Sequence, residues 1–357
     1  MKILFLLPYP IGESPSQRFR FEQYFKVLIQ NGHSIHHQSF LDSSDWKLFF
    51  QKGKLLIKFF FLLRGFLKRF SILLKVNDYS LIFIHREAAP IGPPVFEWII
   101  SKIFRKKMIY DFDDAIWLTD RQNESMILKT LKWRSKVKSI CRWSYKISCG
   151  NQFLCSYAKQ FNKNVHYNPT TIDTENVHNL SLQKIKKDHK VIIGWTGSHS
   201  TLKYLNDLEP VLQSLEQKYY QLQVNVISYI PPPLNLKRIH FSLWSLATEI
   251  SDLAQFDIGI MPLPDDEWAK GKCGFKALQY MALQIPTVAS PVGVNTQIIQ
   301  QGENGFLCSK TDEWENYISI LIENKALRDS MGAAGRKIVV DLYSVSSNSS
   351  NFLSLFS

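Results

Sequence analysis

The sequence of 357 residues lacks several motifs that would define a class of protein directly. Its five cysteines are an odd number and form no CxxC pair, which argues against a disulfide scaffold or a zinc ribbon. No HExxH motif or close His/Cys cluster indicates a metal centre. Neither half contains a GxGxxG or a GxxxxGK(S/T) loop, which disfavours a nicotinamide-binding Rossmann site and a phosphate-loop ATPase.

A long uncharged apolar run is also missing. Residues 55–74 are the longest candidate for a membrane span, but they carry four positive charges, which a spanning helix would not tolerate near its middle. The apolar run at residues 3–7 is short and meets Pro8, so it predicts a first buried strand instead of a signal peptide. We therefore expect a cytoplasmic protein, attached at most to the inner face of the plasma membrane.

Acidic residues are scarce in the first half of the chain. Residues 1–190 contain 31 lysines and arginines against 15 acids, whereas residues 191–357 contain 12 against 16. A basic half of this kind suits nucleic acid or an anionic lipid surface. Because no recognition motif for nucleic acid occurs, we expect no nucleic-acid partner.

The basic character is strongest in residues 54–76, and no acid occurs between Trp46 and Asn77. On a helical wheel, six basic residues lie within an arc of about 140°, and large leucine and phenylalanine side chains lie opposite. The six are Lys54, Lys58, Arg64, Lys68, Arg69 and Lys75. This pattern predicts an interfacial helix that contacts an anionic membrane surface. The other interpretation is an ordinary surface helix whose apolar face packs on its own domain.

Short apolar runs alternate with amphipathic segments along nearly the whole chain, which is typical of parallel α/β folds. Strands are expected at residues 2–7, 34–39, 80–84, 107–112, 146–149 and 165–167, and then at 191–195, 223–227, 258–261, 287–290 and 305–308. Helices are expected at 18–31, 201–218, 275–283, 313–323 and 327–342. The predicted fold class is α/β, with two Rossmann-like doubly wound domains facing across a cleft. Ligands bind beyond the carboxyl ends of the strands in such sheets.

The domain boundaries are predicted from the place where the alternation of apolar runs and amphipathic segments stops. Residues 174–190 lose the apolar pattern and gain charge. We therefore predict a first domain at 1–175, a linker at 176–190, a second domain at 191–342, and a tail at 343–357 that returns to the first domain.

The clearest chemistry lies in residues 256–304. A buried strand at 258–261 ends in an acidic, proline-containing loop, and Gly271-Lys272-Cys273-Gly274 then opens a helix. The first N–H groups of a helix have no intrahelical partner, and the helix dipole favours an anion there. Lys272 and Lys276 bracket the turn and would pair with a diphosphate. A turn chosen only for its backbone, with two solvated lysines, is the alternative.

The same segment resembles the donor-binding region of the family 4 glycosyltransferases, which are retaining nucleotide-sugar enzymes with the GT-B fold. The matching stretches are FDIG at 256–259, GFKALQYMA at 274–282, IPTVAS at 285–290, Gly293, and NGF at 304–306. NPTTID at 168–173 and MGAAGR at 331–336 are also similar to the family pattern. The resemblance covers nearly the whole chain and is strongest over residues 190–343.

The resemblance implies a donor site in the second domain and an acceptor site in the first. Gln279 would bind the ribose, while Lys276 and the Gly274 turn would bind the diphosphate. The full set of implied donor-binding residues is Gly197, Ser198, Lys203, Lys272, Gly274, Phe275, Lys276, Gln279, Gly293 and Asn295. No metal and no cofactor is expected, because lysines and helix N-termini can neutralise a leaving diphosphate.

The chain departs from the family where the family has acids. Two acids eight positions apart fall on Gly271 and Gln279, and a third falls on Gln297. Gln279 keeps its hydrogen-bonding capacity for a ribose diol but loses the charge. Asp266 or Glu267, in the same loop, is a candidate for the missing carboxylate.

The family's histidine at the end of a first-domain strand aligns with Asp113, within YDFDD at 110–114. His85-Arg86-Glu87 ends the preceding strand and would face the same cleft. We take Asp113, Asp114 and His85 as catalytic candidates. The other interpretations are that the two aspartates cap a helix starting at residue 115 and that His85 is a half-buried structural histidine.

Together with the resemblance, these features predict a glycosyltransferase that moves a sugar from a nucleoside diphosphate sugar to a hydroxyl acceptor, and the resemblance alone implies that it is a retaining enzyme. The basic amphipathic segment suggests a lipid-linked acceptor, as in the biosynthesis of cell-surface polysaccharide, lipopolysaccharide or glycolipid. A non-catalytic sugar-nucleotide-binding protein of the same fold and a sugar-nucleotide epimerase are the alternatives.

Overall fold

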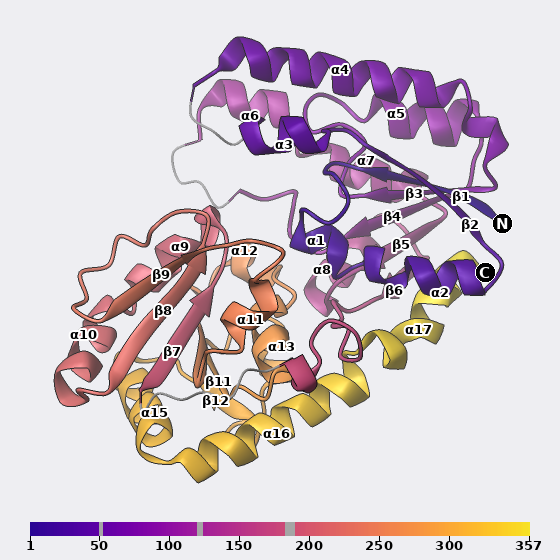
Figure 1. Ribbon diagram of the computed structural model, residues 1–357. Coiled ribbons are helices and arrows are strands. Elements are labelled where there is room, and N and C mark those ends of the chain that lie inside the picture. The colour runs from indigo at the N-terminus through magenta and orange to yellow at the C-terminus, as the bar shows by residue number, and fades with distance from the viewer. Residues whose placement is uncertain (50–52, 120–123, 183–189) are drawn as a thin grey trace. The chain divides into compact units, whose positions relative to one another are not determined.

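The computed structural model describes residues 1–49, 53–119, 124–182 and 190–357 (Figure 1). The chain divides into two compact units: unit 1 comprises Met1–Thr170 and Ser349–Ser357, and unit 2 comprises Thr171–Asn348. Each unit contains one six-stranded sheet in which all the paired strands are parallel. The predicted α/β class, with two Rossmann-like domains, is confirmed.

The sheet of unit 1 has the strand order β2-β1-β3-β4-β5-β6. Its strands are β1 (Lys2–Leu7), β2 (Ser34–Ser39), β3 (Leu81–His85), β4 (Met108–Phe112), β5 (Lys146–Cys149) and β6 (Val165–Tyr167). The central strands β3 and β4 are buried at every residue. Parallel strands that are covered on both faces form continuous apolar runs, which is why the sequence located these strands to within one residue.

The helices of unit 1 are α1 (Pro15–Arg18), α2 (Phe25–Gln30), α3 (Ser43–Phe49), α4 (Leu55–Leu73), α5 (Val95–Trp98), α6 (Met126–Lys132), α7 (Lys136–Trp143) and α8 (Gln152–Lys159). The single helix predicted at 18–31 is wrong, because the chain leaves α1 at Phe19, forms a short 3-10 helix at Glu22–Tyr24, and begins α2 at Phe25. The break turns Arg20 into the interior, where its side chain is 1% exposed.

The end of the chain packs on unit 1. Helix α17 (Val345–Leu353) and the following turn bring Phe352 onto the ring of Tyr24, with 4.2 Å between the centroids. The Lys146 ammonium group donates to the carbonyl oxygens of Ser354 and Ser357 over 2.7 and 2.8 Å.

The unit boundary lies earlier than predicted. The N–H of Ile172 donates to the carbonyl of Tyr343 over 2.8 Å, and its carbonyl accepts from Val345 over 3.0 Å. These bonds place residues 171–175 in unit 2 and not in the first domain. Residues 176–182 and 343–348 also belong to unit 2, and residues 183–189 of the predicted linker lie outside the described residues.

The sheet of unit 2 has the strand order β12-β11-β10-β7-β8-β9. Its strands are β7 (Val191–Thr196), β8 (Leu222–Ser228), β9 (Ile239–Leu243), β10 (Ile258–Met261), β11 (Thr287–Ala289) and β12 (Gly305–Leu307). Sequence patterning missed β9, because this strand lies at the edge of the sheet and none of its residues is fully buried. A half-exposed edge strand lacks the continuous apolar run of the buried ones.

The helices of unit 2 are α9 (His199–Asn206), α10 (Glu209–Lys218), α11 (Glu249–Leu253), α12 (Glu267–Lys270), α13 (Phe275–Ala282), α14 (Asn295–Ile298), α15 (Thr311–Glu323) and α16 (Lys325–Leu342). The single helix predicted at 201–218 is wrong, since α9 ends before Pro210. Proline has no N–H to donate and clashes with the preceding turn, so it stands in the first turn of the new helix α10.

Helix α4 is present as predicted, but Arg69 does not lie on a solvated basic face. Its guanidinium is completely buried and donates to the carbonyl oxygens of Ala88, Gln38 and Leu7 at 2.7, 3.0 and 2.6 Å, and to the Gln38 amide oxygen at 2.7 Å. The helix is therefore fixed to unit 1 through a charged residue. Among the described residues, no helix is both long enough and apolar enough to span a membrane.

Replacing this arginine tests how α4 is attached. Arg69→Met removes the donor for three buried carbonyl groups, so we expect unit 1 to lose about 2–5 kcal/mol of unfolding free energy. Arg64→Met is the matched control, because Arg64 lies on the same helix with 58% of its side chain exposed. Its ion pair with Asp42 should be worth about 1 kcal/mol or less. Equal losses for the two variants in chemical denaturation would contradict this attachment.

Candidate functional site

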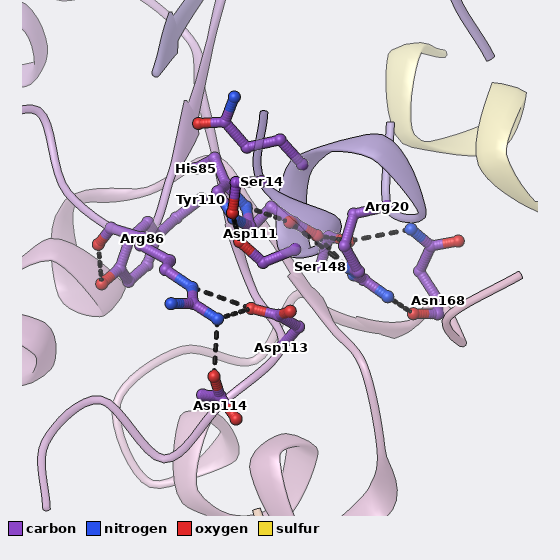
Figure 2. A network of polar contacts seen from close by, with 12 residues as sticks. Ser14, Arg20, His85, Arg86, Tyr110, Asp111, Asp113, Asp114, Ser148 and Asn168 are labelled. Carbon is purple, nitrogen blue, oxygen red and sulfur yellow. Dashed lines mark hydrogen bonds and ion pairs between the residues drawn. The ribbon is translucent and has the colours of Figure 1, made fainter. Parts of the chain in front are cut away.

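A buried carboxylate joins the strand ends of unit 1 (Figure 2). Asp111 lies in β4, and its Oδ2 is 2.8 Å from Nδ1 of His85, the last residue of β3. Since a carboxylate only accepts hydrogen bonds, Nδ1 carries the proton. The Ser148 hydroxyl in β5 donates to Oδ1 over 2.6 Å, and the Arg20 guanidinium forms an ion pair with the same oxygen.

The electrostatics of this cluster keep Asp111 charged. Burial raises the pKa of its carboxyl, but the Arg20 charge and the hydrogen bond from His85 lower it by more, so the net pKa lies well below the ordinary value. Arg20 also donates to the carbonyl of Asn168, which lies two residues before the chain passes from unit 1 to unit 2 at Thr170. The cluster therefore ties three central strands to two loops.

His85 is completely buried, and its second ring nitrogen lies 3.3 Å from the hydroxyl of Ser16. Both ring nitrogens thus have partners within unit 1. This geometry fits a histidine that orients Asp111. A direct catalytic role for His85 stays a prediction.

The two aspartates that follow β4 share one arginine (Figure 2). Arg86 Nε and one terminal nitrogen lie 2.9 and 2.7 Å from Asp113 Oδ1, and the same terminal nitrogen lies 2.6 Å from Asp114 Oδ2. All three side chains are partly exposed, at 18%, 13% and 18%. They form a small charged cluster that a polar ligand can reach.

Arg86 holds an unusual backbone conformation, with φ of 58°. A side chain in the left-handed region costs about 1–2 kcal/mol, so the surrounding structure must hold it there. The N–H of Arg86 donates to the Asp111 carbonyl over 2.7 Å, and its carbonyl accepts from the Tyr110 hydroxyl over 2.7 Å. From the sequence alone, Arg86 is identified only as part of the strand end. Its pairing with Asp113 and Asp114 could have been expected, because the carboxyl ends of neighbouring parallel strands meet at one edge of the sheet.

The interpretation of the two aspartates as a helix cap fails, because residues 116–118 form only a turn and a bend and no helix begins at residue 115. Asp113 and Asp114 are instead held by Arg86 at the carboxyl end of the sheet. Their catalytic role stays a prediction.

In unit 2, the turn before α13 requires glycine. Gly274 has φ of 68°, and a Cβ atom there would lie 2.3 Å from the side chain of Ile298. Gly293 has φ of 55°, and its Cβ would approach the Lys270 carbonyl to 3.0 Å. The Gly274 turn and the loop that follows β11 therefore pack so closely that a side chain at either glycine would clash. This observation agrees with a turn whose glycine is required by the backbone.

Helix α13 is fixed against the sheet through Tyr280. Its hydroxyl accepts from the N–H of Thr196 at the end of β7 over 3.0 Å. Gly259 in β10 makes room for the ring, because a Cβ atom there would lie 2.3 Å from Tyr280. The first turn of α13, which follows the Gly274 turn, is thereby held at the end of the sheet.

The indole of Trp195 brings two predicted donor-binding residues together. The Lys276 ammonium lies 5.4 Å from the centre of its ring, within the range of a cation–π contact. A Cβ atom on Gly197 would lie 2.5 Å from the same ring. Lys276 in α13 and the turn after β7 thus meet at one buried tryptophan, as a phosphate site built from both would require.

The other predicted lysines have different neighbours. Lys272 lies over the ring of Trp268, at 4.8 Å from its centre, and Lys203 lies over Tyr204, at 5.1 Å. Ser198 is the exposed residue before α9. Phe275 is the first residue of α13. The donor-binding roles of these four residues stay predictions.

Gln279, predicted to bind the ribose, is 1% exposed. Its amide nitrogen donates to Glu249 Oε1 over 3.4 Å, and its amide oxygen has no hydrogen-bond partner among the described residues. Trp244 Nε1 donates to the same Glu249 oxygen over 3.2 Å. A buried carboxylate therefore lies directly beside the position where the family has an acid.

Asp266 and Glu267, the candidates for the missing carboxylate, lie in a different loop from Glu249, and their role stays a prediction. Asp266 accepts from the N–H of Ala269 and caps α12, while Glu267 pairs with Lys270 over 3.0 Å. Glu249 lies 30 residues before Gln279 in the sequence. Only the folded chain brings the two together.

Asn295, the last of the predicted donor residues, is 1% exposed at the start of α14. Its amide nitrogen donates to the Ser290 carbonyl over 3.0 Å, and its Oδ1 would lie 3.8 Å from a Cβ atom on Gly274. Asn295 thus lies behind the Gly274 turn. Gln297 is exposed on the same short helix.

Two Rossmann-like units, each with a parallel six-stranded sheet, match the solved structures of GT-B glycosyltransferases. Residues 248–338 match the family model described as glycosyl transferases group 1. This segment contains Glu249, the Gly274 turn, Lys276 and Gln279. This match, over part of the chain, supports a glycosyltransferase of group 1.

Solved structures share the fold over both units at low sequence identity. A sucrose-phosphate synthase from Thermosynechococcus elongatus is 14% identical with a TM-score of 0.71, over 99% of this chain and 98% of that one. The HepE protein of Anabaena, solved with UDP and glucose, is 15% identical with a TM-score of 0.65, over 100% and 99%. A glycosyltransferase from Rickettsia africae is 14% identical with a TM-score of 0.69, over 99% and 97%. No curated protein sequence shows significant similarity to this chain.

Exchanging the amide and the carboxylate tests the Gln279–Glu249 pair. Gln279→Glu places two carboxyl groups side by side, and their repulsion raises the folded pKa of one of them. A raised acid pKa means that stability falls as the pH rises above about 4.3, by about 1–3 kcal/mol at neutral pH. The double variant Glu249→Gln/Gln279→Glu should restore stability. Unfolding curves that show the same loss at pH 5 and pH 8, or no rescue, would argue against the pair.

The buried carboxylate of unit 1 gives a pH-dependent prediction. Asp111→Asn leaves the Arg20 charge buried without its partner, so we expect a loss of about 3–5 kcal/mol near neutral pH. Because the folded pKa of Asp111 is depressed, its contribution is present above the unfolded pKa of about 3.9 and is lost as the pH falls below it. The difference between wild type and variant should therefore shrink from pH 5 towards pH 3. A difference that is constant over this range would contradict the assignment.

Proposed function

We propose that the chain is a retaining enzyme of family 4, which transfers a sugar from a nucleoside diphosphate sugar to a hydroxyl acceptor. The observation that carries the proposal is the meeting of Lys276 and the Gly197 turn at Trp195, within and beside the segment that matches group 1. HepE, which has the same fold, was solved with UDP-glucose. Retention of configuration rests on the resemblance to the family.

The diphosphate would bind where α13 begins. The N-terminal end of a helix carries a partial positive charge and directs N–H groups outward. Lys276, one residue into the helix, adds a full charge. Together they would stabilise the negative charge that develops on the leaving diphosphate, so we propose that transfer needs neither a metal nor a cofactor.

The ribose would bind at the Gln279–Glu249 pair. The Gln279 amide oxygen is an acceptor without a described partner, and a ribose hydroxyl is a suitable donor for it. Glu249 contributes the negative charge that glutamine lacks. This division of one acidic role between two residues accounts for an active enzyme with glutamine at this position.

The acceptor would bind unit 1, where Arg86 holds Asp113 and Asp114 at the carboxyl end of the sheet. Carboxylates accept hydrogen bonds from sugar hydroxyls. We propose that these aspartates orient the acceptor or the transferred sugar. The staphylococcal protein TarM, a looser structural match with a TM-score of 0.57, was solved with UDP and alpha-GlcNAc-glycerol.

We further propose that the acceptor is lipid-linked and that the enzyme acts on the cytoplasmic face of the plasma membrane, in the biosynthesis of cell-surface polysaccharide, lipopolysaccharide or glycolipid. The basic character of the first half of the chain supports an anionic surface as a partner.

A donor screen tests the function. Thermal unfolding is measured with UDP-, GDP- and ADP-sugars, and the stabilising donor is then incubated with and without a membrane lipid extract. We expect one nucleotide class to stabilise the chain and its diphosphate to be released only with the extract. Stabilisation without release in any extract would indicate a non-catalytic binding protein. A changed donor sugar without any acceptor would indicate an epimerase.

Lys276→Ala tests the diphosphate site. Loss of a charged contact to phosphate should weaken nucleoside diphosphate binding by about 1.5–3 kcal/mol, which is about 10- to 150-fold in calorimetry. Lys325→Ala is the matched control, since Lys325 is an exposed lysine of α16 paired with Asp329. Unchanged affinity in the Lys276 variant would remove this residue from the site.

A further inference from the structure

Helix α4 exposes its apolar face. Leu56, Phe60, Leu67 and Leu74 are 77%, 63%, 60% and 87% exposed, although they are large and apolar. Phe59, Leu63 and Phe70 on the same helix are also exposed. We call these seven residues the α4 apolar face. Soluble monomers rarely expose a continuous apolar surface of this length, so such a face usually has a partner.

The rotation of α4 is fixed by the residues on its inner side. Arg69 is anchored by its buried hydrogen bonds, and Gly65 lies so close to Phe40 that a Cβ atom would be 2.3 Å from the ring. Arg69 and Gly65 lie opposite the α4 apolar face at 100° per residue. The interpretation in which the apolar face packs on its own domain therefore fails for most of this face, although Phe70 touches Phe96 at its edge.

The neighbouring helix continues the exposed surface. Phe70 of α4 contacts Phe96 of α5, with 5.1 Å between the ring centroids, and α5 lies beside α4 in Figure 1. Val95 and Trp98 on α5 are 41% and 44% exposed. Tryptophan and phenylalanine are the side chains that interfacial helices insert at the boundary between headgroups and acyl chains.

The positive charge along α4 indicates which kind of partner would cover this surface. Lys54, Arg64 and Lys75 are exposed along α4 and its ends, and no acid occurs between residues 46 and 77. Asp42 and Asp45 neutralise part of this charge, since Arg64 pairs with both and Lys68 with Asp42. The segment remains positive. A second copy of the chain would bring like charges together, whereas anionic headgroups complement them.

We propose that α4 lies in the surface of an anionic lipid bilayer, with the α4 apolar face in the headgroup region and its basic residues among the phosphates. The helix has 19 residues and is therefore about 28 Å long, and its apolar residues run along its whole length. The inference deepens the proposed function and rests on it only for the lipid-linked acceptor. Membrane contact would hold unit 1 at the surface where such an acceptor is found.

Vesicle co-sedimentation tests this inference without a donor or an acceptor. The full chain is mixed with vesicles of phosphatidylcholine alone or with added phosphatidylglycerol. We expect binding to the anionic vesicles, weakened by salt, and little binding to the neutral ones. The double variant Phe60→Gln/Leu67→Gln should reduce the partition coefficient by about tenfold or more, because it removes two large apolar side chains from the interface.

The matched control is Leu246→Gln/Leu342→Gln, which changes two leucines of unit 2 that are 54% and 57% exposed. It should bind vesicles like the wild type. Both variants should keep wild-type thermal stability and donor-induced stabilisation, which separates failure of membrane binding from failure of the transferase site. Absence of binding, equal binding to both vesicle types, or equal binding of the α4 variant would overturn the proposal. So would a dimer in lipid-free solution that the α4 variant abolishes.

Discussion

The Asp111 carboxylate is the contact on which the arrangement of unit 1 depends. A charge in the interior is tolerated only when other groups neutralise and solvate it, and here Arg20, His85 and Ser148 do so from three separate segments. Once these partners are fixed, the ends of β3, β4 and β5 are fixed with them. The Arg86–Asp113–Asp114 cluster begins one residue beyond His85 and two beyond Asp111, so its position follows.

In unit 2, neutral groups fix the elements that carry the candidate site. The Tyr280 hydroxyl bonds to the end of β7, and glycines in β7 and β10 let aromatic rings lie against the strands. These contacts fix the position of α13 relative to the sheet, and with it the positions of the Gly274 turn, Lys276 and Gln279. In both units, a buried side chain near the carboxyl end of the sheet, Asp111 or Tyr280, positions the polar residues that follow the strands.

Much of this fold could be predicted from the sequence, because strands buried on both faces leave continuous apolar runs. The edge strand β9 lacks that signal, and the break at Phe19 depends on the partner that Arg20 finds in β4. The helical wheel separated the faces of α4 correctly but placed Arg69 with the solvated residues. Only the folded chain supplies the carbonyl groups of Leu7, Gln38 and Ala88 that bind Arg69.

The candidate site divides in the same way. Local motifs predicted the Gly274 turn and Lys276, because a helix and its preceding turn are continuous in the sequence. The partners of these residues are distant: Trp195 precedes Lys276 by about 80 residues, and Glu249 belongs to another helix. Such pairs leave no periodic pattern in a single sequence.

Hydrogen exchange with and without the stabilising sugar nucleotide tests the central claim most directly, which is that unit 2 binds the diphosphate at the start of α13 beside the turn after β7. The account predicts slower exchange of backbone amides in residues 196–203 and 274–280. Protection confined to unit 1, or to the outer strands β8 and β9, would contradict it.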